Sequence, residues 1–247
     1  TVMGSTLKNK VLKLTDNGED IVNGVYIIRE GQEINTFYMS KSAGVDPTTG
    51  EQLYWAYEKN ADGSMKPGSE YMTNDATVAA GCKYLQGSRI PDIYGSISSS
   101  LKFRGFDLGL LFTYSLGGKI YDSIYNAMME PSFVGQTYHR NALRTWTAPG
   151  QRTDVPRTTT TASTQITDRY LVDASYFAVK NISLGYSLPK GVLGKVGIES
   201  LRVYLSADSP WIFTHLKGMN PQASFTGSTS YSYTPNRTFT LGVDLKF

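Results

Sequence analysis

The sequence predicts an all-β fold, specifically part of a transmembrane β-barrel with long loops on one side of the membrane and short turns on the other. Two positive observations favour it: several segments alternate apolar and polar residues with a period of two, and long connections alternate with short ones. No apolar run approaches the ~18 residues that a spanning helix needs. The chain has 247 residues, enough for one large β domain.

The last strand of the chain shows the clearest alternation. One face is apolar and consists of Phe239, Leu241, Val243, Leu245 and Phe247. The other face is polar and consists of Thr238, Thr240, Gly242, Asp244 and Lys246. In a membrane barrel the apolar face contacts the lipid bilayer and the polar face lines the lumen. A β-sandwich strand with one wet face would show the same pattern, so this segment alone leaves both folds open.

The other predicted strands follow in chain order. A weaker pair covers residues 34–42 and 52–58, and the sequence between them, residues 44–50, has the Asp-Pro and Gly of a turn. Residues 97–103 and 106–114 predict a hairpin of two long strands joined at Arg104-Gly105. Residues 181–188 and 201–206 repeat the same alternation.

The lengths of the connections separate a barrel from a sandwich. The short connections cover residues 44–51, 104–105 and 189–199, and the long ones cover residues 59–92, 117–175 and 209–235. Transmembrane barrels have short periplasmic turns and long extracellular loops. A sandwich has no reason to segregate its loops in this way, so the pattern favours the barrel.

The longest connection contains a helical pattern. Ile120, Ile124 and Met128 recur at helical spacing, with Tyr121 and Tyr125 beside them. This spacing predicts a short amphipathic helix over residues 120–129 that packs on the loop or the barrel rim, in preference to a cofactor site.

The sequence shows no motif for catalysis, a cofactor or a metal. Cys82 is the only cysteine, which excludes an internal disulfide framework and a cysteine metal cluster. Neither His139 nor His215 has a ligand partner at metal-binding spacing. There is no nucleophile elbow and no glycine-rich phosphate loop. The net charge of +3 is spread along the chain without a basic cluster, so we expect no nucleic-acid partner.

A series of motifs goes beyond these general patterns. The series is Gly44-Val-Asp-Pro-Thr-Thr-Gly50, Pro91-Asp-Ile-Tyr-Gly95, Phe106-Asp-Leu, Gly117-Gly-Lys-Ile-Tyr121, Trp146-Thr-Ala-Pro-Gly150, Asp154-Val-Pro-Arg157, Asp173-Ala-Ser-Tyr176, Lys180-Asn-Ile-Ser-Leu-Gly-Tyr-Ser-Leu-Pro189 and Arg237-Thr-Phe-Thr-Leu-Gly. In this order it resembles the C-terminal barrel region of SusC/RagA-type TonB-linked outer-membrane proteins of Bacteroidetes. The resemblance covers about residues 9–247. Ser96 and the stretch 206–210 depart from the usual pattern; the fold tolerates both departures, and neither carries information about the substrate.

The resemblance implies a role in transport. It implies a barrel of roughly 22 strands with a plugged lumen. Residues 1–247 would supply the last seven or eight strands, and the plug and the segment that contacts the TonB complex would lie upstream, so we expect the chain to begin within a longer protein. It also implies a bacterial outer-membrane importer of oligosaccharides or peptides, not an enzyme, with a SusD-like lipoprotein as partner. A passive porin-like pore and a secreted carbohydrate-binding or hydrolytic β-sandwich are the alternatives.

Aromatic side chains near the predicted extracellular end are candidates for contact with a ligand or a partner. These candidates are Trp55, Tyr121, Tyr125, Trp146 and Trp211. Aromatic rings stack on sugars and anchor protein interfaces. Other aromatic residues near strand ends, including Phe103 and Tyr186, fit the interfacial girdles of a barrel.

Overall fold

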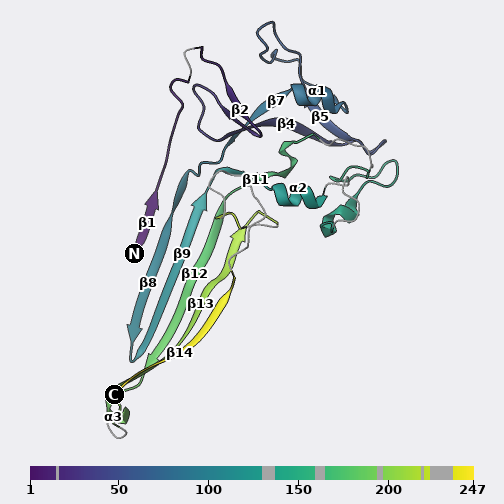
Figure 1. Cartoon of the computed structure of the whole chain (residues 1–247). Coiled ribbons are helices and arrows are strands. Elements are labelled where there is room, and N and C mark those ends of the chain that lie inside the picture. Colours follow the sequence, from purple (N-terminus) through teal and green to yellow (C-terminus); the bar gives the residue numbers. More distant parts are fainter. Residues whose placement is uncertain (15–16, 130–136, 159–164, 194–196, 218–219, 223–235) are drawn as a thin grey trace.

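A computed structural model describes the chain except residues 15–16, 130–136, 159–164, 194–196, 218–219 and 223–235. Its dominant feature is one antiparallel sheet of six long or edge strands. The strands are β1 (Val2–Ser5), β8 (Ile93–Phe103), β9 (Phe106–Leu116), β12 (Tyr176–Ser187), β13 (Ser200–Thr214) and β14 (Thr238–Lys246), in that spatial order. Figure 1 shows this large sheet as a curved, open wall with the C-terminus at its lower end.

A second, smaller region lies beyond the upper end of the large sheet (Figure 1). Its sheet contains β2 (Ile21–Asn23), β3 (Tyr26–Ile28), β4 (Thr36–Val45), β5 (Gln52–Ala56) and β6 (Tyr71–Thr73), and β7 (Lys83–Ser88) also pairs with β4. The short strands β10 (Lys119–Tyr121) and β11 (Leu171–Asp173) pair with each other. We call this region, residues 6–92 with 117–175, the loop region.

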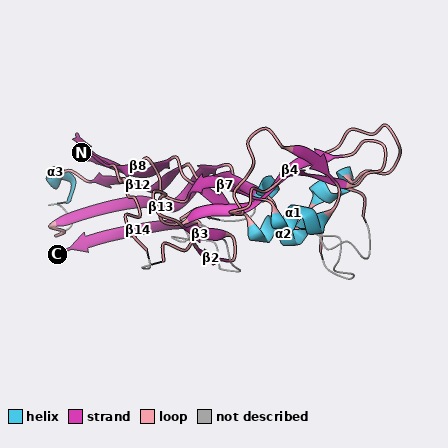
Figure 2. Cartoon of the chain, turned by 90° about the horizontal axis from the view of Figure 1, so that it is seen from above, coloured by secondary structure: helices cyan, strands magenta, loops and turns pink. Residues whose placement is uncertain are grey.

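Short helices complete the structure. They are α1 (Ala76–Gly81), α2 (Ser123–Met129), α3 (Lys190–Leu193) and the 3-10 helices η1 (Arg140–Arg144) and η2 (Asp168–Tyr170). Figure 2 shows α1 and α2 in the loop region, far from both chain termini, whereas α3 lies beside the C-terminus (Figure 1). The helix α2 confirms the helical spacing within residues 120–129, although Ile120 and Tyr121 belong to β10 instead. No described helix is long and apolar enough to cross a membrane.

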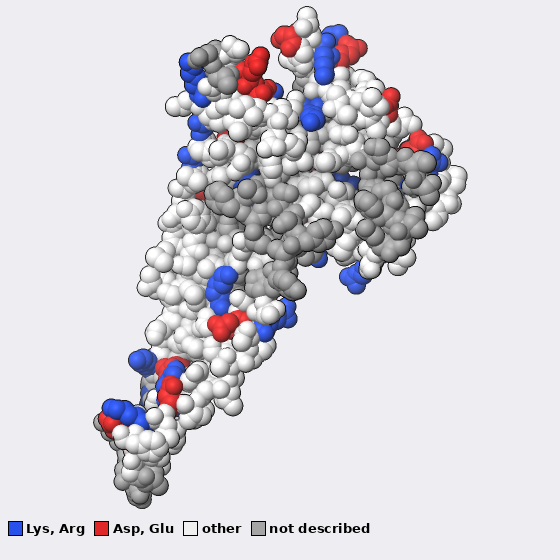
Figure 3. Space-filling model, viewed as in Figure 1, with Lys and Arg blue, Asp and Glu red and all other residues white. Residues whose placement is uncertain are grey.

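The register of the large sheet sorts its residues into two faces. Leu184 pairs with Leu108 on one side and with Leu205 on the other, and Leu205 pairs in turn with Leu241. Directly paired residues project to the same face of a sheet, so these leucines form a continuous apolar row. The alternate residues, such as Asp107 and Arg202, form the opposite, polar face. Figure 3 shows charged side chains over the loop region, part-way down the large sheet and near its lower end.

Strands β12 and β13 contain a β-bulge, and above it the apolar residues still lie on the same face of the sheet as below it. The register of β12 shifts between Val179 and Asn181, and Ser209 of β13 has a positive φ of 48°. A bulge inserts an extra residue and restarts the alternation. Trp211 and Phe213 therefore pair with Val179 and Phe177 and rejoin the apolar face.

The hairpin around Arg104-Gly105 is confirmed. Its strands β8 and β9 pair from Ile93↔Leu116 to Phe103↔Phe106. Arg104 and Gly105 have φ values of 46° and 88°, which a two-residue hairpin turn of the favoured hand requires. The predicted short turns at 104–105 and 189–199 lie at one end of the large sheet, and the described parts of the predicted long connections 59–92 and 117–175 lie at the other, as expected. Residues 223–235 of the third predicted long connection, 209–235, lie outside the described residues.

Two details differ from the expectation. The pair β4–β5 belongs to the loop region, so the turn after Val45 is not one of the short turns of the large sheet. The large sheet has six strands among the described residues instead of seven or eight, and the edge strand β1 was not predicted. The assignment of β4 failed because a period of two shows only that one face of a strand is covered, and it does not show whether lipid or protein covers that face. For β4 the covering groups are protein, because Phe37 and Met39 are 0% and 2% exposed.

The main core lies in the loop region and not against the large sheet. Its buried residues are Phe37, Met39, Tyr121, Met129, Val155 and Tyr170. They come from β4, β10, α2 and η2 and from the loop at residue 155, so this core joins segments far apart in the sequence. The loop region is therefore a packed structure that positions a fixed site.

Candidate functional site

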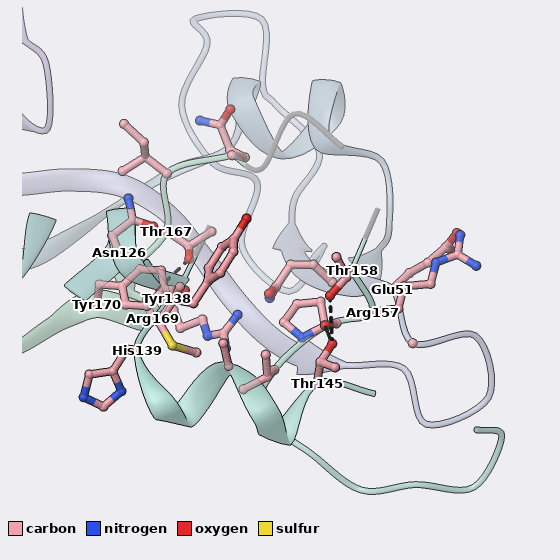
Figure 4. Close-up of a pocket in the computed structure, with 18 of the residues that line it drawn as sticks. Glu51, Asn126, Tyr138, His139, Thr145, Arg157, Thr158, Thr167, Arg169 and Tyr170 are labelled. Atoms are coloured by element: carbon pink, nitrogen blue, oxygen red, sulfur yellow. Dashed lines mark hydrogen bonds and ion pairs between the residues drawn. The ribbon is translucent and has the colours of Figure 1, made fainter. Parts of the chain in front are cut away.

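A cavity of about 860 Å³ opens in the loop region. One wall consists of residues around β5 and α1, and the other consists of residues from β10 through η1 together with the stretches 155–158 and 165–170. Ligand sites are usually concave and of this size. Figure 4 shows Arg169 and Tyr138 reaching into its centre, with Thr145, Thr158 and the Glu51–Arg157 pair on the far side.

Basic side chains dominate the charge of this cavity. Among the described residues, its lining includes Arg140, Arg157 and Arg169 but only one carboxylate, Glu51. An Nη2 atom of Arg157 lies 2.8 Å from Oε1 of Glu51, so these two charges offset each other. The Arg169 guanidinium lies 5.2 Å from the ring centre of Tyr170, which braces it by a cation–π contact.

The remaining polar groups of the cavity include four carboxamides, together with threonines, tyrosines and His139. Gln52, Asn74, Asn126 and Gln165 line it. A carboxamide both donates and accepts hydrogen bonds. Asn74 already donates to Oε2 of Glu51 at 2.6 Å. No group of three or more His, Cys, Asp or Glu side chains that could hold a metal occurs among the described residues.

A smaller cavity of about 290 Å³ shares Gln52, Arg169 and Tyr170 with the larger one. It also has Asp122, Asp154, His215 and Lys217 in its lining. The Lys217 ammonium lies 5.1 Å from the centre of the Tyr125 ring. Asp168 lies next to this cavity, where it accepts a hydrogen bond from the backbone N–H of Ser42, a lining residue. Burial raises the pKa of the Asp168 carboxyl, and this hydrogen bond offsets part of the rise.

Two of the five predicted aromatic contacts belong to the core of the loop region. Tyr121 is 4% exposed, although it lines the larger cavity. Tyr125 packs against the same core, lines the smaller cavity and accepts a hydrogen bond of 2.7 Å from Asn141.

The three tryptophans have different surroundings. Trp146 donates from Nε1 to the Pro47 carbonyl at 3.0 Å, and its ring lies against Gly50. Trp55 lies in β5 with the Lys41 ammonium 5.7 Å from its ring centre. Trp211 lies on the apolar face of the large sheet and is 52% exposed. The structure therefore brings none of the three into the lining of the larger cavity, as far as the described residues show.

The predicted apolar face of the last strand is present and exposed. Phe239, Leu241, Val243 and Leu245 lie on one face of β14 and are 47–74% exposed, and Phe247, beyond the strand, is 82% exposed. Leu241 and Val243 continue the row through Leu205 and Val203. A broad exposed apolar face of this kind marks a surface that contacts lipid or another protein.

Part of the connection after β13 folds onto the polar face of the large sheet. Gln222 accepts a hydrogen bond from the Lys180 ammonium and donates one to Thr113. The neighbouring Pro221 is fully buried and accepts from the Arg89 side chain at 3.2 Å. This segment therefore covers the upper part of the polar face.

The arginines of the cavity were not among the residues predicted from the sequence. Arg140 and Arg169 are separated by a long stretch of chain and share no motif, and only the fold of the loop region brings them into one cavity. The one available signal was the occurrence of Arg in a connection that also carries aromatic residues. That signal is too common in loops to identify a site.

No protein-family model matches the chain. TonB-dependent receptor P3 of Formosa agariphila is 28% identical over 263 residues, which cover 97% of this chain and 26% of the receptor. TonB-dependent receptor SusC of Bacteroides thetaiotaomicron is 24% identical, and the match covers 97% of this chain and 23% of the receptor.

The fold matches solved structures of a peptide importer over almost the whole chain. The RagAB peptide transporter gives a TM-score of 0.74 at 26% identity, over 95% of this chain and 24% of the compared chain. The RagAB peptide importer in its open-open state gives 0.74 at 27% identity, over 96% and 25%. The chain therefore spans about a quarter of the length of the proteins it matches.

Proposed function

Because the chain is a homologue of SusC/RagA-type TonB-dependent receptors over about a quarter of their length, we propose that it forms part of an importer of oligosaccharides or peptides. The observation that carries the proposal is the match to RagAB peptide importer structures over nearly the entire chain, loop region included. Such receptors are outer-membrane transporters and not enzymes. We propose as well that the full-length receptor has a plug domain and a segment that contacts the TonB complex, both upstream of these residues.

In this proposal the apolar face of the large sheet contacts the lipid bilayer. The terminal strand contributes Phe239, Leu241, Val243, Leu245 and Phe247 to that face. Aromatic residues flank the aliphatic band on the same face: Phe177, Trp211 and Phe213 near the loop region, and Phe103, Phe106 and Tyr186 near the short turns. Aromatic girdles at both interfaces are typical of membrane barrels.

The loop region then faces the cell exterior and meets a SusD-like surface lipoprotein. We place part of that contact on the connection 117–175, because Tyr138, Leu143 and Ile166 are 40%, 87% and 45% exposed there. Exposed apolar side chains around a cavity suit a surface that a partner covers. The partner would close the larger cavity and trap the substrate.

Co-purification tests the partner. In the full-length receptor, Leu143→Glu should weaken recovery of the lipoprotein severalfold, because it places a charge in the proposed interface. Val192→Glu is the matched control, since Val192 is also exposed, at 59%, but lies beside the short turn at the opposite end of the large sheet. Equal recovery with both variants would move the interface away from Leu143.

Uptake tests the transport function and the porin alternative together. Cells that carry the full-length receptor are given fluorescent short peptides or oligosaccharides, with and without a functional TonB. Uptake of either class that requires both the receptor and TonB supports the proposal. Uptake that persists without TonB, together with passive solute flux through the purified protein in vesicles, would assign a pore instead.

A further inference from the structure

The larger cavity carries an excess of positive charge that no carboxylate of the described residues offsets. Arg157 is paired with Glu51, but none of those carboxylates lies within ion-pair distance of Arg140 or Arg169. The nearby acids have other partners: Asp154 pairs with Arg144 at 3.0 Å, and Asp122 accepts from the Tyr125 backbone N–H at 3.0 Å. Two guanidinium groups are therefore available to a ligand in this cavity.

Arginine is suited to recognise carboxylates. Its planar guanidinium presents several N–H donors that fit the two oxygens of a carboxylate, and the resulting hydrogen bonds are stronger than those between neutral groups. The Tyr170 ring beneath Arg169 limits the freedom of that side chain, so less conformational entropy is lost when it binds. The charge of the cavity thus favours a ligand with carboxylate groups.

The other lining groups favour a peptide over a sugar. Sugar rings stack on open aromatic faces, but three of the four lining tyrosines, Tyr54, Tyr121 and Tyr170, are 3%, 4% and 9% exposed. Carboxamides suit a peptide backbone, because each can donate to a carbonyl and accept from an N–H. Asn126 and Gln165 offer such groups, whereas the amide nitrogen of Gln52 already donates to Ser42 and to two backbone carbonyls.

We propose that this cavity binds short acidic peptides, with Arg169 and Arg140 holding their side-chain or terminal carboxylates. The proposal rests on the proposed import function and names its substrate class. The volume of about 860 Å³ is that of a site for a ligand of a few residues and not for a folded protein. Acidic peptides would then be bound in preference to neutral or basic ones of the same length.

Binding to the purified full-length receptor with its lipoprotein tests the proposal. The probes are fluorescent peptides that alternate alanine with glutamate, glutamine or lysine, and binding is followed by anisotropy. The glutamate peptide should bind most tightly. Arg169→Gln should weaken its binding about tenfold, the order expected for one charge-assisted contact, and leave the glutamine peptide unaffected. Arg140→Gln should act in the same direction.

Two further variants control for structural damage. Arg152→Gln changes an exposed arginine of the same connection that does not line the cavity, and it should leave all three affinities unchanged. Arg169→Glu should reverse the preference and favour the lysine peptide, which a merely unfolded loop would not do. Loss of binding for all peptides with Arg169→Glu, or equal binding of the glutamate and glutamine peptides by the unaltered receptor, would overturn the proposal.

An acidic oligosaccharide is the competing ligand. An oligomer of uronic acid that binds more tightly than the glutamate peptide, with the same dependence on Arg169, would refute the peptide assignment. Failure here is separable from failure of the import function: TonB-dependent uptake of neutral peptides that survives Arg169→Gln, without any preference for acidic ones, would refute only the proposed substrate class. An absence of all uptake would refute the function.

Discussion

Arg202 of β13 reaches across strand β12 to Asp107 of β9, and its Nε and Nη2 atoms donate to the two carboxylate oxygens at 3.0 and 2.7 Å. The third nitrogen of the group donates to Asp244 of β14 at 3.1 Å. One side chain thus ties together strands on both sides of β12. This is possible because Gly185 of β12 has no side chain in the path: a Cβ there would lie 2.7 Å from Nε of Arg202.

The Arg202 contact predicts that Gly185 is intolerant of any side chain. Gly185→Ala should destabilise the full-length receptor by about 1–3 kcal/mol, because the added methyl forces Arg202 away from Asp107. The free energy of unfolding is measured by urea titration in lipid vesicles. Gly191→Ala is the matched control, since no atom lies within 4 Å of a Cβ at Gly191. Equal effects of the two substitutions would show that the ion pair between Arg202 and Asp107 does not require a glycine at position 185.

Gly50 and Trp146 predict a second steric effect, in the loop region. A Cβ at Gly50 would lie 2.4 Å from ring atoms of Trp146, and φ at Gly50 is +75°. Gly63 has a similar φ of +81° but open space around it. Gly50→Ala should therefore cost about 1–3 kcal/mol more than Gly63→Ala, since only the first displaces a ring. Urea unfolding followed by tryptophan fluorescence measures both, and equal costs would mean that Trp146 moves aside freely.

The raised pKa of Asp168 predicts a pH dependence. From the ordinary value of 3.8 up to its folded-state pKa, the folded chain holds this proton while the unfolded chain releases it, so stability falls as the pH rises through that window. Asp168→Asn has no carboxyl to titrate. The variant should therefore be more stable than the unaltered protein at pH values above the folded-state pKa of Asp168, and equally stable below pH 3.8. Urea unfolding of the loop region between about pH 3 and pH 7 measures the difference.

Asp62 provides the control of opposite sign. Hydrogen bonds from Ser64 lower the pKa of its carboxyl, so its contribution is present above pH 3.8 and is lost as the pH falls through the lowered folded-state value. Asp62→Asn should remove that contribution at neutral pH. A gain in stability from Asp62→Asn, or a loss from Asp168→Asn, would contradict the direction of the corresponding pKa shift.

The large sheet was predictable because each strand has one apolar and one polar face. The pairs from Leu108 through Leu184 and Leu205 to Leu241 all follow from a period of two, and Arg104-Gly105 fixes the register of one hairpin. The assignment of β4 to a different sheet was not predictable. Phe37 and Met39 alternate in the same way as lipid-facing residues do, and only the packed chain shows that Tyr121 and Tyr170 cover them.

The candidate site was less predictable than the fold. The aromatic residues were recognised by type, but Tyr121 and Tyr125 are needed for packing in the loop region and Trp146 braces the turn at Pro47. Arg140 and Arg169 carry no local signal, because what distinguishes them is that no described carboxylate lies within ion-pair distance of their guanidinium groups. Such an absence depends on contacts between segments distant in sequence, which no period or motif records.

If the large sheet is a membrane wall whose apolar face contacts lipid, a charge placed on that face of the last strand should cost far more than one placed on the opposite face. Leu241 lies on the apolar face and Thr240 on the polar face. In a vesicle-folding titration of the full-length receptor, Leu241→Arg should cost about 2–4 kcal/mol if it lies near the midplane, and Thr240→Arg much less, since its charge reaches water or polar surface. Equal costs, or a larger cost at Thr240, would show that Leu241 does not face lipid.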